Sequence, residues 1–477
     1  MKRHSTPVRS RTVNATCGHA FRAIAVLIAV ALPQISTAEP TRIALDQAPQ
    51  LVESLLSQNQ PLAAREVALA AHQANPADAN HLIALARAEL ALKNFDAAIA
   101  AGSQAWQRAT SDGQRFVAAD TVAAAHFNAR NLTRSQFWLR RTRQYAPNQA
   151  TADRVAQDYA TVRAQNPWST NLRFGASPTS NINNGSTNQE VKLFDLPFLF
   201  QLNGEAKALS GVEITAGADV SYRLTVSETA ATYATGSVDF RTYSLSKSAQ
   251  DQAPDALGRD FSDGTVTAGI SHRRILRENA LPAAFSLLIG QTYYSEDLHS
   301  RFLAGSIAQG FEIDPDNTID LSLAFRSQTD LTSDAPKSVL DRTADRSLQF
   351  GVSWRHGFAW SDILTLGAII NRSTSQNSDS EFRSVTYRAN YAIADPVLGM
   401  KFAFGVDAET RNFDATRFQS GAREDVALTL SLDVEFADIE FYGFRPVVNA
   451  QLKRNRSDVD LFDRDYRSLG FDLRSSF

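Results

Sequence analysis

The sequence predicts a multidomain α + β protein, in which an N-terminal α-helical solenoid is followed by a 14-stranded antiparallel transmembrane β-barrel. Three observations predict this fold class. Residues 45–165 are rich in Ala, Leu, Gln and Arg and repeat small residues at helical spacing. Residues 166–477 alternate apolar and polar side chains in segments of about ten to fifteen residues, separated by turn-rich stretches. The chain ends on such a segment, and its last residue is Phe477.

The N-terminus has the features of a secretory signal peptide. An apolar run at 23–32 is followed by Ser36 and Ala38, the small residues expected before a cleavage site. We therefore expect residues 1–38 to be removed after Ala38. The alternative is an uncleaved anchor, but about ten apolar residues are too few to span a bilayer as a helix. Five basic residues precede the run: Lys2, Arg3, Arg9, Arg11 and Arg22.

Composition limits the cellular compartments and the classes of partner that are expected for this chain. Removal of residues 1–38 would change the formal net charge from -3 to -8, because five positive charges and no negative charge are lost. A nucleic-acid partner is not expected, since the chain has no basic bias. Cys17 is the only cysteine, so the exported chain is expected to lack disulfides and thiol chemistry. No apolar run of about 18 residues follows Ala38, which leaves a periplasmic, secreted or outer-membrane protein.

Residues 39–165 are expected to form a helical repeat domain of three helix-turn-helix units. Each unit has small residues seven positions apart in its second helix, which lets two helices approach closely. The pattern resembles tetratricopeptide repeats, and a generic Ala-rich bundle is the alternative. A solenoid of this kind presents a surface that binds peptides or proteins. The marker residues are Ala64, Ala71 and Pro76, then Ala98 and Ala105, then Ser135, Thr142 and Pro147.

A basic cluster lies on the last repeat. It is most simply a solvated helix face, and the alternatives are a site for an acidic client protein or a contact with the barrel rim. Its members are Arg134, Arg140, Arg141 and Arg143.

Residues 166–477 are expected to form the barrel. The clearest alternating segments are 212–226, 347–355 and 425–436. Each has apolar residues on one face and charged residues on the other, for example Asp219 and Arg223 in the first. Inside a soluble β-sandwich such charges would be costly unless paired, whereas the lumen of a wide barrel is wet. The pattern therefore favours a membrane barrel over a sandwich.

The last segment is expected to be the barrel-closing strand. Apolar residues alternate with Gly470, Asp472 and Arg474, and an edge strand of a soluble sheet is the alternative. The apolar face consists of Leu469, Phe471, Leu473 and the terminal Phe477.

Connection lengths alternate, as expected for a barrel with short periplasmic turns and longer outside loops. The segment 233–246 lacks clean alternation and is assigned to a long outside loop at 227–262, which gives an even count of fourteen strands. Ser210 and Gly211 are expected to form a tight turn after the second strand. The long connections are expected at 329–344, 412–423 and 456–464, and the short ones at 314–317, 358–360, 394–398 and 437–440.

A local motif follows the first predicted strand: Pro178, Asn181, Ile182 and Asn183 form a P-x-x-N-I-N segment. With the signal peptide, the repeats and the terminal hairpin at 439–477, it resembles the surface lipoprotein assembly modulator (Slam) family. The resemblance implies a periplasmic tetratricopeptide-repeat domain and a fourteen-stranded barrel in the outer membrane of a Gram-negative bacterium. It also implies three partners: a client surface lipoprotein or secreted protein, outer-membrane lipid, and the barrel assembly machinery during insertion.

No catalytic, cofactor-binding or metal-binding motif is present in the sequence, so we do not expect an enzyme. Three other functions remain open. One is an exopolysaccharide export porin with periplasmic repeats, although three repeats and a lumen of mixed charge fit it less well. The others are a general diffusion porin and an outer-membrane enzyme.

Overall fold

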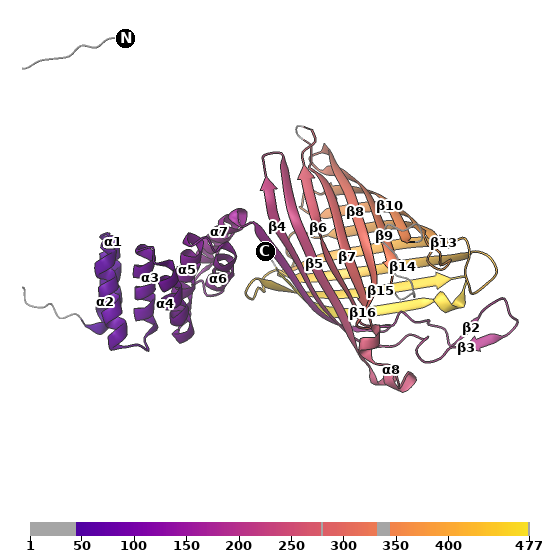
Figure 1. Ribbon diagram of the computed structural model, residues 1–477, viewed down its shortest axis with the longest axis horizontal. Coiled ribbons are helices and arrows are strands. Elements are labelled where there is room, and N and C mark those ends of the chain that lie inside the picture. The colour runs from indigo at the N-terminus through magenta and orange to yellow at the C-terminus, as the bar shows by residue number, and fades with distance from the viewer. Residues whose placement is uncertain (1–43, 278–279, 332–343, 476–477) are drawn as a thin grey trace, which may run out of the picture. The chain divides into compact units, whose positions relative to one another are not determined.

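The computed structural model describes residues 44–277, 280–331 and 344–475. The predicted signal peptide and Phe477 lie outside these ranges. Within them the chain forms a series of helices followed by a closed β-barrel, which confirms the predicted fold class (Figure 1). None of the described helices is both long enough and apolar enough to cross a membrane.

The helical part is built from pairs of helices that pack through small side chains. The six predicted small positions lie on α2, α4 and α6, and each is at most 4% exposed. Gly102 of α4 extends this pattern, because a Cβ there would lie only 2.5 Å from Cγ2 of Val122 on α5. The helices are α1 (Ala48–Ser57), α2 (Pro61–Ala74), α3 (Ala79–Ala91), α4 (Phe95–Arg108), α5 (Asp112–Asn128), α6 (Leu132–Gln144) and α7 (Gln149–Gln165).

Fourteen strands form the barrel, and every neighbouring pair is antiparallel. The hydrogen-bonded order runs from β1 through β16 and back in descending order to β4, which pairs with β1. The strands are β1 (Trp168–Thr179), β4 (Gly211–Val226), β5 (Ala230–Leu245), β6 (Asp263–Arg274), β7 (Ala283–Tyr294), β8 (Asp297–Asp314), β9 (Asn317–Asp330), β10 (Asp345–Gly357), β11 (Ile363–Thr374), β12 (Phe382–Ala392), β13 (Met400–Phe413), β14 (Arg423–Phe436), β15 (Phe444–Ser457) and β16 (Arg464–Ser475).

The predicted number of strands is confirmed, but two strand assignments were wrong. The segment 233–246, expected in an outside loop, lies almost wholly in β5. Its alternation is obscured because Tyr233 and Tyr243 are in phase with the charged Asp239 and Arg241, on the face opposite Val238 and Phe240. The expected second strand before Ser210 is instead a loop.

That loop, residues 180–210, leads directly from β1 to its neighbour β4. Within it β2 (Glu190–Lys192) and β3 (Leu199–Gln201) form a small separate hairpin. Its apolar residues resemble a strand in the sequence, but Phe194, Phe198 and Leu199 are more than half exposed. A second long loop, between β5 and β6, contains the short helices α8 (Lys247–Gln252) and η2 (Gly258–Phe261).

The barrel has an apolar outer face and a polar inner face. On β16, Leu469, Phe471 and Leu473 are 62%, 47% and 38% exposed, whereas Asp472 and Arg474 point to the other face and pair with each other. The two ends of the barrel also differ. One end, here called the short-turn end, carries the connections at 227–229, 315–316, 358–362, 393–399 and 437–443, and β6 ends and β7 begins there. The opposite long-loop end carries those at 180–210, 246–262, 295–296, 375–381, 414–422 and 458–463, and β9 ends and β10 begins there.

Candidate functional site

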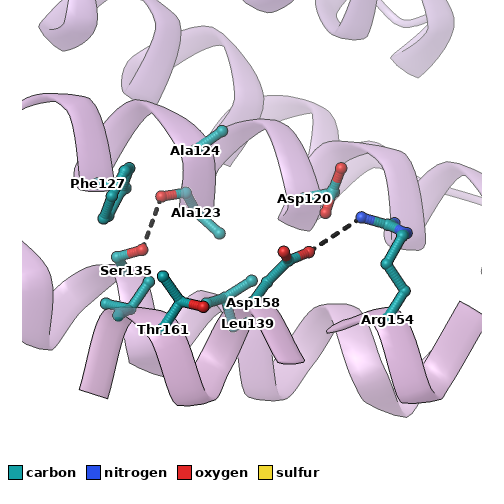
Figure 2. Close-up of a pocket in the computed structure, with 10 residues that line it drawn as sticks. Asp120, Ala123, Ala124, Phe127, Ser135, Leu139, Arg154, Asp158 and Thr161 are labelled. Atoms are coloured by element: carbon teal, nitrogen blue, oxygen red, sulfur yellow. Dashed lines mark hydrogen bonds and ion pairs between the residues drawn. The ribbon is translucent and has the colours of Figure 1, made fainter. Parts of the chain in front are cut away.

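A cavity of about 280 Å³ opens between α5, α6 and α7. Its walls are mostly apolar, and Ser135 closes one side by donating a 2.9 Å hydrogen bond to the carbonyl oxygen of Ala123 (Figure 2). Three charged residues gather at the other end, where Asp120 of α5 faces Arg154 and Asp158 of α7 (Figure 2). The apolar lining residues are Ala123, Ala124, Phe127, Leu139 and Val162.

The charged end of this cavity has a net negative charge. Arg154 forms an ion pair with Asp158, with Nη1 and Oδ2 3.0 Å apart, and both side chains are about half exposed. Burial raises the pKa of Asp120, Arg154 lowers it and Asp158 raises it again. The net effect is a raised pKa for Asp120, because the nearby positive charge does not offset the burial of its carboxylate. The cavity is thus suited to an apolar side chain that lies beside a cationic group.

The arginines of the predicted basic cluster on α6 make different contacts. Arg140 donates to the hydroxyl of Tyr159 at 3.2 Å, and Arg141 lies 3.6 Å from the centre of the Phe137 ring. Arg143 forms an ion pair with Glu440 in the connection after β14, with Nη1 and Oε1 2.7 Å apart. Arg141 also lies 5.4 Å from the centre of the Tyr442 ring, so two of these arginines lie against the connection 437–443 at the short-turn end.

The lumen wall is lined by ion pairs of both signs. Arg173 of β1 pairs with Asp219 of β4 and, at 2.7 Å, with Asp239 of β5. Arg474 of β16 pairs with Asp433 of β14 at 2.9 Å. The charges around Arg173 and Arg474 are therefore balanced. The remaining wall pairs include Arg241 with Glu213, Arg355 with Asp320, Arg388 with Asp407 and Arg445 with Glu435.

The motif residues organise the loop 180–210. Asn183 donates to the carbonyl oxygens of Glu205 and Lys207 and accepts a hydrogen bond from the amide of Leu209. Asn181 donates to the carbonyl oxygens of Gly185 and Asp465, and thus connects the loop to β16. Ile182 is 6% exposed and packs in a small apolar cluster with Leu209 and Ala249. Pro178 lies within β1.

The closing strand joins β1 through a short and interrupted ladder. Register pairs join Arg173 to Arg474 and continue to Ala176 and Phe471, then resume at Thr179 and Ser468. The interruption falls at Pro178, which has no N–H group to donate. On its other side β1 pairs with β4 without a break from Trp168 to Thr179.

Several of these features were missed by sequence reasoning. Nothing in the sequence near Arg173 indicates that it bridges Asp219 and Asp239, because the three residues meet only through strand register. The cavity on α5 to α7 was also missed, although the small residues at 123–125 and the acidic Asp120 were a usable signal. In the part of the chain that the structure describes, no group of three His, Cys, Asp or Glu residues is arranged to hold a metal ion.

No protein-family model matches the sequence, and no curated protein matches it significantly. Among solved structures, the type III secretion translocator chaperone SycD of Yersinia enterocolitica is 16% identical, with 26% of this chain and 88% of that chain covered and a TM-score of 0.24. OccK7 (OpdD) of Pseudomonas aeruginosa is 12% identical, with 65% and 98% covered and a TM-score of 0.31. OccAB3 of Acinetobacter baumannii is 9% identical, with 65% and 99% covered and a TM-score of 0.33. At these identities and TM-scores the similarities carry no information about function.

Proposed function

We propose that this protein is an outer-membrane translocation or assembly factor that delivers lipoproteins or other client proteins to the bacterial cell surface. The observation that carries the proposal is the joining, in one chain, of a helical domain that has a binding cavity to a closed barrel with an apolar outer face. The resemblance to the Slam family in the motif after β1 supports the same function.

The barrel supports an outer-membrane location. A closed barrel leaves no unpaired sheet edge, and its exposed apolar belt suits a lipid environment. In such barrels the short turns face the periplasm. Since β1 begins at the short-turn end directly after α7, the helical domain would lie in the periplasm, where a client arrives after export.

The helical domain supports a protein client. An apolar cavity with an acidic end can hold an apolar side chain of an unfolded segment next to a lysine or arginine. A passive pore would have no use for this cavity. Around Arg173 and Arg474 the lumen wall carries both signs of charge, whereas steering of an acidic polysaccharide would use a one-sided field.

The test compares surface proteomes. Intact cells of the encoding bacterium, with and without the gene, are treated with protease, and the released peptides are identified by mass spectrometry. We expect particular lipoproteins or secreted proteins to lose surface exposure in the deletion strain and regain it on complementation. A variant with Asp120→Lys should complement poorly, whereas Asp153→Lys, an exposed acid on α7 outside the cavity, should complement fully.

Two outcomes would replace this proposal. An unchanged surface proteome with loss of a secreted polysaccharide would favour an exopolysaccharide export porin. An unchanged surface proteome with faster uptake of small solutes by liposomes containing the purified protein would favour a diffusion porin, since the barrel alone accounts for that activity.

A further inference from the structure

Among the described residues, the junction between β1 and β16 has fewer paired residues than any other junction between neighbouring strands of the barrel. β1 pairs with β16 through five residue pairs and with β4 through twelve. The two missing positions, Ser177 opposite Gly470 and Pro178 opposite Leu469, are those that would need the absent N–H of Pro178. Proline inside a sheet is normally confined to an edge strand, so β1 has the character of an edge on this side.

Side chains on the lumen face do not compensate. Arg173 and Arg474 lie directly opposite each other across the junction, and like charges in this position repel. Each is neutralised on its own side, Arg173 by β4 and β5 and Arg474 by β14 and β16. Among the described residues no ion pair joins β1 to β16. Both strands could therefore separate with their ion pairs intact.

The two ends of the junction are held differently. At the long-loop end, the segment 180–195 crosses from β1 to the loops before β14 and β16. Its backbone amides donate to the carbonyl oxygen of Arg467 at 3.0 Å, of Asp463 at 2.9 Å and of Phe418 at 2.6 Å. At the short-turn end the hydrogen bonds pass through the hydroxyl of Ser475, which accepts from the amide of Leu172 and donates to Asn171.

We propose that the β1–β16 junction is a lateral binding site for an extended client segment, and that it opens from the short-turn end while the segment 180–195 holds the long-loop end together. The freed edges of β1 and β16 would hydrogen-bond a client strand by β-augmentation. The segment that fits has alternating side chains, apolar toward lipid and polar toward the lumen. This inference rests on the proposed function and names the surface at which the client is held.

Disulfide locking tests the proposal in full-length protein in cells. In a background with Cys17→Ser, Phe174→Cys and Leu473→Cys place two thiols directly opposite each other across the junction, on the side of its short-turn end. Phe350→Cys and Ile370→Cys form the matched control, since they are directly opposite on β10 and β11 and also replace a phenylalanine and an aliphatic residue of the exposed outer face. Heat-dependent migration on gels shows that each barrel is folded. The readout is the surface proteome of intact cells before and after reduction.

We expect the oxidised junction lock to lower client exposure at least fivefold, reduction to restore it, and the control lock to have no effect. Equal exposure with both oxidised locks would overturn the inference and leave the proposed function standing. If the unlocked protein changes no client, the proposed function fails first.

Photo-cross-linking gives a second, independent readout. A photoreactive amino acid at Leu172 of β1 should capture the clients named by the surface proteome, whereas the same group at the outward Leu366 of β11 should not. Equal capture at both positions would contradict a specific site at the junction.

Discussion

Arg173 shows at the scale of a single residue how the lumen wall is balanced. Its guanidinium group bridges carboxylates from two neighbouring strands, Asp219 and Asp239. The bridge needs a glycine beneath it, since a Cβ at Gly217 would lie 2.7 Å from Oδ1 of Asp239 and 3.0 Å from Nη2 of Arg173. Loss of this arginine would leave two neighbouring carboxylates unneutralised.

We expect Arg173→Gln to lower the free energy of unfolding of the barrel by about 1–2 kcal/mol, because charged hydrogen bonds of this kind contribute about that much when partly exposed. Urea unfolding of the protein in detergent, followed by tryptophan fluorescence, measures the change. Arg355→Gln is the control, since Arg355 makes one longer pair with Asp320 at 3.7 Å. An equal loss in both variants would contradict a special role for the bridge.

Because Asp120 is partly buried, we expect the stability of the helical domain to depend on pH. Burial raises its pKa in the folded state, so the ionised carboxylate opposes folding. Stability should therefore fall as the pH rises from the unfolded value, about 4, through the raised folded value, and then level off. We expect Asp120→Asn to raise the unfolding temperature of the helical domain at pH 7.5 and to have no effect below about pH 4. Calorimetry at both pH values checks this, with the exposed Asp153→Asn as control.

At the scale of an element, the loop 180–210 is organised by side-chain amides rather than by a strand ladder. Asn183 links the start of the loop to Glu205, Lys207 and Leu209 near its end. These three hydrogen bonds hold the two ends of the loop together beside β1 and β4. The P-x-x-N-I-N motif thus has a structural role in the loop.

We expect Asn183→Ala to make the loop 180–210 sensitive to protease, because three hydrogen bonds to its far end are lost. The barrel should still migrate as a folded species on gels. Limited trypsin digestion, with cleavage at Lys192 and Lys207 read by mass spectrometry, measures the effect. Asn203→Ala removes only a local bond to the amide of Ala206, so it should leave cleavage unchanged. Equal sensitivity in both variants would argue against a special contribution of Asn183.

At the scale of the whole molecule, the closed barrel of fourteen strands depends on β5. Val238 is 51% exposed on the outer face, whereas the neighbouring Ser237 bonds to Thr267 at 2.7 Å on the inner face. We expect Val238→Arg to destabilise the barrel in lipid by about 2–4 kcal/mol and Ser237→Arg to be tolerated, since charge is costly only on the lipid face. Refolding into liposomes at graded urea concentrations compares them. If both substitutions were tolerated, the assignment of this segment to a membrane-spanning strand would be wrong.

The fold class, the small-residue faces of α2, α4 and α6, and most of the strands could be predicted from local sequence patterns. These features are local: helix packing demands small residues at a fixed spacing, and lipid on one face with water on the other imposes alternation residue by residue. The connection at 456–464 and the turn at 314–317 could also be predicted, because turn-forming residues are a local signal as well.

Contacts between residues far apart in the chain could not be predicted without the three-dimensional structure. The bridge from Arg173 to Asp239, the cavity beside Asp120 and the gap opposite Pro178 depend on strand register and helix packing, which join residues far apart in the chain. The inner face of β5 carries tyrosines, so local hydrophobicity does not distinguish its two faces and the strand could not be predicted from the sequence. There, pairing with β4 and β6 assigns the strand, because backbone hydrogen bonds in a closed barrel must be satisfied by neighbours.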